Sequence, residues 1–399
     1  MNGRRTIALI TLALTVGAIC SVTALAQNAD PVATTPPAPP PPLSPVIWSE
    51  NPDVIQRFAV TDNQRVREMV DRCLLKLTSA SDIATAWTRL GITPSDIVGI
   101  KITTTGGQLL STHRPIVQAI CAGIEEVGVP PSHIVVWDKN EAIMVAAGYA
   151  PTPATDSTVA IDSVFPGTGY DPDVFYKNGI IGSLIWGDSE FVRHDDDLDE
   201  AAQEAVKKKG YTGDGSASDF TSIDDPLNGG STIPQSSDRS HYARLVTSIC
   251  TKIVNVPVLT DNSAIGIDGC LGTLAFGMID NDRRFQNDPT FGDPAIGEIL
   301  DKDFVRRKVV VHILDALISQ YAGGPHFDPQ FTKSIGAIYV GRDPVAIDSL
   351  VLKRLEAWRA ADRNGRIDLI GKAASHIHSA AESNIGTDDP ARIQLIRVP

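Results

Sequence analysis

Charged and amide side chains stand at the ends of five apolar, strand-like runs in the sequence. They are Lys101 in IVGIKI, Asp138 at the end of HIVVWD, Asp261 with Asn262 after KIVNVPVL, Asp315 in VVVHILDAL, and Asp343 after SIGAIYVG. One such ending is ordinary turn chemistry. Five of them in a parallel sheet predict a polar cleft, because the binding crevice of such sheets lies beyond the carboxyl ends of the strands.

Two of these residues, Lys101 and Asp138, have an ordinary interpretation beside the functional one. Lys101 either packs its stem while its ammonium reaches solvent, or anchors an anion at the crevice. Asp138 either caps the helix that begins near Glu141, or serves as a general base or a metal ligand. Both are candidate catalytic residues, as is Asp315.

The stretch GRDPVAIDSLVLKRLE (341–356) holds two aspartates with different roles. Asp343 before Pro344 is typical of a helix start. Asp348 shares a helical face with Val345, Val351, Leu352 and Leu355. A carboxylate on an apolar face needs a partner. If the partner is Lys101 or a metal ion, Asp348 is catalytic; if it is a set of backbone donors, Asp348 is structural.

Three further side chains are candidates for binding or proton transfer. His326 follows a Gly-Gly-Pro loop, and histidine is the residue type best suited to proton transfer near neutral pH, so His326 is a candidate general acid or base. Arg283 and Arg284 could form a forked clamp for a carboxylate or phosphate. Because neighbouring side chains point in different directions, we expect at most one of the two arginines to face a site.

The elements that must position these residues follow from hydrophobic periodicity. Residues 61–78 have helical spacing, and a second helix ends at Gly91. The strand 97–102, the helix from Ser111 to Gly128 and the strand 133–138 form a βαβ unit, which implies a parallel pair of strands. Further strands are expected at 252–259, 309–317 and 334–341. The fold class is therefore α/β, with a largely parallel or mixed sheet flanked by helices.

The ends and the middle of the chain have a different composition. Residues 1–26 resemble a signal peptide, with Arg4 and Arg5 before an apolar run and Ala24-Leu25-Ala26 as the cleavage pattern. They predict export to the periplasm or the exterior, and the paired arginines suggest the twin-arginine route; an N-terminal membrane anchor is the alternative. Residues 27–48 form a proline-rich linker. Residues 49–399 then form one domain, in which 151–240 is an irregular polar insertion with little regular structure.

Charge and cysteine usage exclude several classes of partner. Removal of residues 1–26 takes away two arginines and no acid, which changes the net charge from −13 to −15. Such an acid excess argues against nucleic acid as a partner, and no membrane span remains after cleavage. Cys73, Cys121, Cys250 and Cys270 form no C-x-x-C pair, so a zinc ribbon is not expected. One disulfide remains open.

Two motif-like segments are interpreted as ordinary structure. ADRNGRID (361–368) resembles the middle of a calcium loop but lacks both end ligands, so a turn is expected. His376 and His378 would lie together only on an extended strand.

Several of these segments occur in an order that is similar to a known family. They are IVGIKI, IVVWD, KIVNVPVLTDN, GCLGTLAFG, NDRRF, VVHILDAL with Gly323-Gly324-Pro325, and GRDPVAIDSLVL. Together they resemble the domain of unknown function 362 family, from about residue 60 to the C terminus, with 151–240 interrupting. The resemblance implies an α/β fold and no established activity. Some relatives carry ferredoxin-like cysteines that this chain lacks, so no iron–sulfur cluster is expected.

The resemblance also implies polar residues at three places where this chain differs. Thr103 stands where relatives commonly have asparagine, residues 260–262 stand where many have Lys-x-His, and Gly272 and Thr273 replace a Lys-Asn pair. Thr103, Asp261 and Asn262, with the two arginines, are therefore the candidate ligand-binding residues.

Two functions are consistent with this pattern. In the first, the protein is an exported enzyme whose cleft combines Lys101, Asp138, Asp315, His326 and Asp348 and acts on a small anionic or carbohydrate-like substrate, with a divalent cation as a candidate cofactor. In the second, it is a non-catalytic binding or interaction module that has lost polar residues of the family. The metal, the substrate and the oligomeric state are left open.

Overall fold

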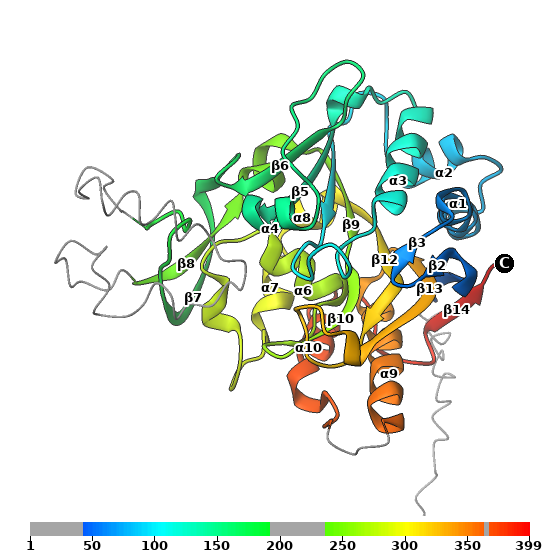
Figure 1. Cartoon of the computed structure of the whole chain (residues 1–399). Helices are drawn as coiled ribbons and strands as arrows, with labels where there is room; N and C mark the ends of the chain where they lie inside the picture. Colours follow the sequence, from blue (N-terminus) through cyan, green and yellow to red (C-terminus); the bar gives the residue numbers. More distant parts are fainter. Residues whose placement is uncertain (1–42, 192–235, 363–366) are drawn as a thin grey trace, which may run out of the picture. The chain divides into compact units, whose positions relative to one another are not determined.

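A computed structural model describes residues 43–191, 236–362 and 367–399, and these residues form a ten-stranded mixed sheet (Figure 1). The eight strands along the sheet are, in spatial order, β14 (Ile393–Arg397), β1 (Ser44–Glu50), β13 (Thr332–Gly341), β12 (Val309–Gln320), β9 (Lys252–Val256), β4 (Val98–Ile102), β5 (Ile134–Asn140) and β6 (Ala160–Phe165). Strand β10 (Val258–Asn262) pairs with β12, and β11 (Gly266–Ile267) pairs with β10. The predicted α/β class is confirmed.

The centre of the sheet is parallel, as the βαβ pattern predicted. β4 pairs in parallel with β5 and with β9, so that Ile100 lies beside Val136 and Val254. Helix α3 (Arg114–Glu126) makes the crossover between β4 and β5, and Gly128 ends it with a φ of +98°. All five residues of β4 are buried, which explains its continuous apolar run.

One strand next to this parallel centre runs the other way. β13 is antiparallel to β12, and Gly341 at its carboxyl end lies beside His312 near the start of β12. Asp343 is therefore at the edge opposite the carboxyl ends of β4, β5 and β9. The expectation that all five polar strand ends share one edge is wrong for Asp343, because it assumed that β13 was parallel.

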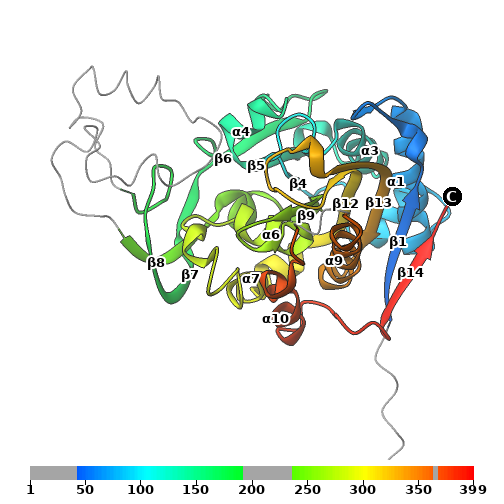
Figure 2. The same ribbon diagram turned by 60° about the horizontal axis from the view of Figure 1, so that its bottom comes forward.

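Helices cover both faces of the sheet (Figure 2). One face carries α1 (Asn63–Thr78), α2 (Ile83–Arg89) and α3, whose apolar residues pack with one side of β4, β9 and β12. The other face carries α6 (Gly269–Gly277), α7 (Ala295–Leu300), α9 (Pro344–Ala361) and α10 (His376–Glu382). The short helix α4 (Glu141–Ala146) follows β5, and the short helix α8 (Asp303–Lys308) precedes β12. β2 (Ile55–Gln56) and β3 (Ala59–Val60) form a separate two-stranded ribbon.

Local signals in the sequence set the ends of the longer helices. Asp62 caps α1 by accepting a hydrogen bond from the Arg65 amide at 2.9 Å, and Ser79 ends it in the left-handed conformation. Asp343 caps α9 by accepting from the Ala346 amide at 2.9 Å, as the Asp-Pro pair predicted.

The expected insertion contains regular structure. β6 extends the main sheet, and β7 (Tyr170–Ser183) and β8 (Ser236–Ala243) form a second, two-stranded sheet. The prediction of little regular structure is therefore wrong for these strands: Tyr176 and Tyr242 pack into the core, and Ser237 and Ser240, which are typical loop residues in sequence, are buried in the ribbon. The expected linker also ends earlier than predicted, since β1 begins at Ser44.

Several sequence features lie outside the described residues: the signal-like segment, most of the proline-rich run, the acidic and lysine runs between 192 and 235, and the centre of the calcium-like segment at 363–366. Among the helices that are described, none is long and apolar enough to cross a membrane. Cys73, Cys121, Cys250 and Cys270 are all free thiols. His376 and His378 lie on α10, where His376 is buried and His378 is exposed and bonded to Asp388.

Candidate functional site

A cleft of about 580 Å³ opens at the carboxyl ends of the parallel strands, the edge at which the sequence predicted it. Its walls come from the loop after β4, the end of β5, the segment after β10, helix α6 and the loop after β12. The polar residues that line it include Lys101, Thr103, Thr104, Asp138, Lys139, Asp188, Asn262, Asp268, Thr273, Asp282, Arg283 and His326. Phe165, Tyr170, Trp186 and Phe276 add aromatic surface.

Lys101 and Asp138 form a buried ion pair on this wall. The Lys101 Nζ lies 2.8 Å from Asp138 Oδ1, and the two residues are 1% and 8% exposed. The same Nζ donates to the Ile102 carbonyl at 2.6 Å. Lys101 therefore does not extend its ammonium into solvent; a carboxylate of the protein already occupies it.

Asp138 holds the loop after β4 and does not cap a helix. Its Oδ2 accepts from the amide and the hydroxyl of Thr104, at 2.9 and 2.6 Å. The cap of α4 is Asn140, whose side chain accepts from the Ile143 amide at 3.2 Å. The helix-cap interpretation of Asp138 is thus wrong, because the strand continues two residues further than predicted.

Helix α6 makes room for the Lys101 side chain. A Cβ added at Gly277 would overlap the Cε of Lys101. A side chain at this position would therefore force Lys101 to move, which explains the glycine near the end of an otherwise well-packed helix.

Asp268 is the acid that the sequence analysis missed, and it faces the cleft. Its Oδ1 accepts from Asn262 Nδ2 at 2.6 Å, and within the described residues its Oδ2 has no hydrogen-bond partner. Asp268 is only 9% exposed, and burial raises its pKa to about 6. A carboxyl group with this pKa can both give and take a proton near neutral pH.

Asp348 takes the helix-capping role that Asp268 would otherwise fill, so the Asp268 carboxyl group can face the cleft. The two carboxylate oxygens of Asp348 accept from the amides of Cys270 and Leu271 at 2.7 and 2.9 Å, so it caps α6 from a distant part of the chain. Asp268, at the cap position itself, makes no side-chain cap bond. Gly269 is required here, because an added Cβ would lie 2.6 Å from the Asp348 carboxyl group. The catalytic expectation for Asp348 is therefore wrong: it is fully buried and its partners are backbone donors.

A second ion pair, between Lys139 and Asp282, closes another side of the cleft. Burial opposes the charge of Lys139, but Asp282, Asp188 and Asp280 outweigh it and raise the Lys139 pKa. The neighbouring Arg283 also lines the cleft. Arg284 does not: its guanidinium bonds to the Ile180 carbonyl and the Ser240 hydroxyl and lies over the Phe285 ring. The expectation that one arginine at most faces the site agrees with this arrangement, and Arg284 is removed from the ligand-binding candidates.

Asp261 fixes the loop that carries His326. The Asp261 Oδ1 accepts from the Gly324 amide at 3.0 Å, and its Oδ2 pairs with Arg359 at 3.0 Å. Asp261 therefore positions the loop and does not line the cleft, whereas Asn262 and the exposed His326 do. Burial raises the pKa of Asp261 to about 6 in spite of Arg359.

Asp315 lies away from the cleft. It is fully buried, and its Oδ2 accepts from the His113 amide at 2.7 Å and lies 2.8 Å from His113 Nδ1. It thereby anchors the start of α3. The expectation that Asp315 ends a strand is wrong, because β12 continues to Gln320.

The three places where this chain differs from the expected family pattern meet in the cleft. Thr103, Asn262, Gly272 and Thr273 all line it, and the hydroxyls of Thr103 and Thr273 lie 3.4 Å apart. In the described part of the chain, no group of three or more histidines, cysteines or acids could hold a metal ion, so the proposal below uses none.

Asp268 and Asp188 had no usable signal in the sequence. Asp268 precedes the glycine-rich segment GCLGTLAFG, where it looks like an ordinary helix cap, and Asp188 lies in the segment predicted to be irregular. Only the long-range cap by Asp348 shows that Asp268 is not needed at the helix end.

Comparisons with known proteins place part of the chain in a family. The sequence pattern of the domain of unknown function 362 matches residues 175–353, beginning inside the segment predicted to be an insertion. A search of curated proteins gives no match.

A crystal structure of a Thermotoga maritima protein, determined by a structural genomics consortium, aligns with a TM-score of 0.35 and 9% identity. The alignment covers 76% of this chain and 59% of that one, so the chain spans less than two thirds of the other protein. This similarity is too distant to carry an argument. The family match confirms the resemblance seen in the sequence over part of the chain: residues 175–353, which supply α6, β10 and the loop after β12, match the domain of unknown function 362.

Proposed function

We propose that the cleft binds a small polyhydroxylated, carbohydrate-like molecule and that Asp268 exchanges a proton with it. The observation that carries the proposal is the Asp268 carboxyl group, which is buried at the cleft, has a pKa of about 6 and has one oxygen without a partner among the residues that the structure describes. A buried acid with a perturbed pKa in the main cleft is the usual mark of a proton-transfer site.

The charge balance of the walls favours a neutral, hydroxyl-rich ligand over a strongly anionic one. Both lysines of the cleft are paired with aspartates, Lys101 with Asp138 and Lys139 with Asp282. An anion would have to compete with these carboxylates for the same ammonium groups and would also face Asp188 and Asp268. Hydroxyl groups, in contrast, can donate to the carboxylates and accept from Asn262 and the threonines.

The aromatic part of the lining supports the same class of ligand. The Trp186 ring is held edge-to-face between Phe165 at 5.9 Å and Phe191 at 6.1 Å. Trp186, Phe165, Tyr170 and Phe276 place apolar surface beside acids and amides, a combination that suits the C–H groups and the hydroxyls of a sugar ring.

The test is a binding and turnover assay with a defined panel of monosaccharides, disaccharides, uronic acids and polyols, with inorganic phosphate and simple sugar phosphates as the anionic set. We expect calorimetric binding from the neutral set, and conversion that is lost in Asp268→Asn while affinity changes by less than about threefold. Binding of phosphates alone would contradict the proposal for the ligand. Conversion that survives Asp268→Asn would contradict the role of Asp268.

A second candidate function is binding without catalysis, and one observation favours it. The residues that differ from the family pattern, Thr103, Asn262 and Thr273, gather in this cleft and not elsewhere on the described sheet edge. The same assay separates the two candidate functions. If the protein is a binding module, the wild-type protein binds a ligand but does not convert it.

We also infer that the protein acts outside the cytoplasm. The inference rests on Arg4, Arg5 and the apolar run that precedes Ala24-Leu25-Ala26. N-terminal sequencing of the protein from its native host tests it: we expect a first residue at Gln27, and an intact Met1 with soluble cytoplasmic protein would contradict it.

A further inference from the structure

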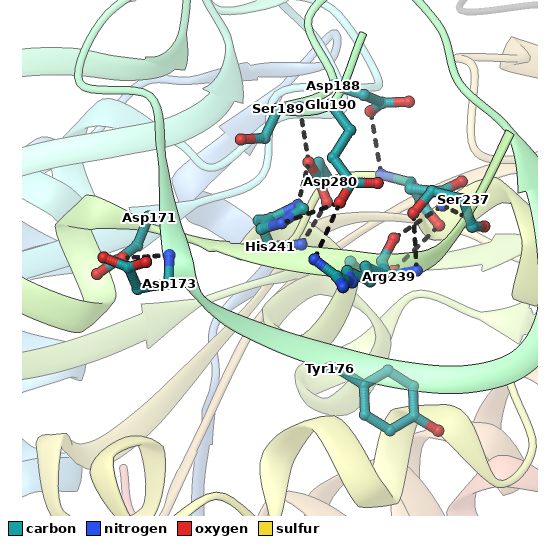
Figure 3. Close-up of polar contacts among 12 residues, drawn as sticks. Asp171, Asp173, Tyr176, Asp188, Ser189, Glu190, Ser237, Arg239, His241 and Asp280 are labelled. Carbon is teal, nitrogen blue, oxygen red and sulfur yellow. Dashed lines mark hydrogen bonds and ion pairs between the residues drawn. The ribbon is translucent and has the colours of Figure 1, made fainter. Parts of the chain in front are cut away.

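Residues 184–191, which we call the strap, follow β7 and bring Ile185, Trp186, Gly187 and Asp188 into the cleft wall. The strap is tied to the turn at residues 280–281 by two reciprocal bonds (Figure 3). Asp188 Oδ1 accepts from the Asn281 amide at 3.0 Å, and Asp280 Oδ2 accepts from the Ser189 amide at 2.7 Å. The position of Trp186 and Asp188 at the cleft therefore depends on Asp280.

Asp280 is in turn held by His241 on β8. Asp280 Oδ1 accepts from the His241 backbone amide, and Oδ2, the atom that binds the strap, lies 3.2 Å from His241 Nδ1. On the other side of the ring, His241 Nε2 lies 3.7 Å from Glu190 Oε1, which belongs to the strap itself. The ring thus sits between one acid of the turn and one acid of the strap, as Figure 3 shows.

The chemistry of imidazole makes this arrangement depend on protonation. A neutral ring carries a proton on one nitrogen only, so it can donate to Asp280 or face Glu190 favourably, but not both. The imidazolium form carries a proton on both nitrogens and a charge that both acids stabilise. Asp280 is fully buried, so water cannot take the place of the imidazolium beside it when that charge is lost.

The surroundings of His241 also include groups that oppose the positive charge of its ring. Arg239 lies on the same strand, pairs with Glu190 at 3.6 Å and opposes the charge of the ring. The Phe175 ring of β7 packs edge-on against His241 at 5.6 Å and is itself covered by Arg239. Burial also opposes the charge, but Asp280 and Glu190 outweigh these effects and raise the pKa of His241.

We propose that His241 is a positioning residue of the cleft: when protonated, it holds Asp280 and Glu190 together and thereby fixes the strap with Trp186 and Asp188 at the ligand site. The direction of the pH dependence follows from the geometry. Below its pKa, His241 bridges the two acids and the strap is fixed; as the pH rises through that pKa, the bridge is lost and the strap loosens. The consequence for ligand binding rests on the proposed function, whereas the attachment of the strap does not.

The test is hydrogen–deuterium exchange of the full chain, expressed as protection factors so that the intrinsic pH dependence of exchange is removed. In wild-type protein we expect the protection of the strap amides, Ser189 among them, to fall about tenfold between about pH 6 and pH 9. His241→Gln should have low protection across the whole range. His378→Gln is the matched control, since His378 also pairs with an acid but is exposed and lies on α10; it should leave the strap unchanged.

Two further measurements keep the proposal falsifiable if His241→Gln does not fold. Glu190→Gln should move the pH at which strap protection falls to a lower value than in wild-type protein, because it removes one of the two acids that support the imidazolium and leaves the bond between Asp280 and the Ser189 amide intact. NMR titration of the His241 ring should give a pKa above the ordinary range. Strap protection that does not change with pH in wild-type protein, or a His241 ring that is neutral near pH 6, would overturn the proposal. These readouts need no ligand, so a failed saccharide screen and a failed strap experiment are separate results.

Discussion

Asp268→Asn is the substitution that tests the candidate site at its chemical centre. Asparagine has nearly the same shape as aspartate and keeps a carbonyl oxygen that can accept from Asn262 at the 2.6 Å position. The substitution therefore removes the ionisation of this group and little else. Any pH-dependent difference between the variant and wild-type protein reports the pKa of Asp268.

The magnitude follows from burial of the carboxylate. The folded pKa is about 6 against an ordinary value of 3.8, a difference that corresponds to about 3 kcal/mol. Because the folded protein holds this proton more tightly than the unfolded chain, ionisation of Asp268 costs stability. The cost is absent below about pH 4, grows through about pH 6 and is complete above about pH 7.

The assay is urea unfolding followed by circular dichroism at several pH values for both proteins. Between about pH 4 and pH 8 we expect the free energy of unfolding of Asp268→Asn to rise by about 3 kcal/mol relative to wild type. Asp156→Asn is the control, since Asp156 is an exposed aspartate before β6; its difference from wild type should stay constant.

The result that would refute the reasoning is a difference between Asp268→Asn and wild type that is the same at all pH values. It would mean that Asp268 has an ordinary pKa and is not the proton-exchanging group of the cleft. A difference of opposite sign would show that the carboxylate has a charged partner in solution.

Three other substitutions test the supports of the site. Asp348→Ala leaves the amides of Cys270 and Leu271 without acceptors in a closed core, so urea unfolding should show a loss of about 3 kcal/mol. The exposed helix cap Asp62→Ala should lose about 1 kcal/mol, and equal losses would contradict the long-range cap. Lys101→Met should cost about 3 kcal/mol by leaving Asp138 unpaired, and Asp138→Asn in the same chain should restore part of it; no recovery would argue against the pair. Arg359→Met should raise the pKa of Asp261 above its value of about 6, seen by carbon NMR of the carboxyl group, and an unchanged pKa would show that Arg359 does not support the Gly324 loop.

Much of the fold could be predicted because its signals are local. The alternation of apolar strands with the helix of Ser111–Gly128 specified the parallel centre, and Asp-Pro at 343–344 specified the start of α9. The direction of β13 was missed although β12 directly precedes it: the connection 321–331 holds no α-helix and is too short for the usual crossover, so the two strands pair antiparallel. Only the pairing of β13 with β1 joins segments far apart in the chain. The error in the position of Asp343 followed from the missed direction of β13.

Part of the candidate site could also be predicted from local signals. Lys101, Asp138, Asn262 and His326 lie in the cleft because the carboxyl ends of parallel strands meet at one edge. The roles of Asp348 and Asp268 could not be predicted: the acid on the apolar face caps a helix 78 residues away, and the acid at the cap position faces the cleft. Both roles depend on tertiary contacts that no local pattern encodes.

The most direct test of the proposed site is the NMR spectrum of the amide groups during titration with the neutral saccharide panel. We expect at least one saccharide to shift the amides of Thr104, Lys139, Gly187 and Gly324 around the cleft, with inorganic phosphate leaving them unchanged. Shifts confined to other surfaces, or shifts at the cleft from phosphate alone, would contradict the assignment of this cleft to a carbohydrate-like ligand.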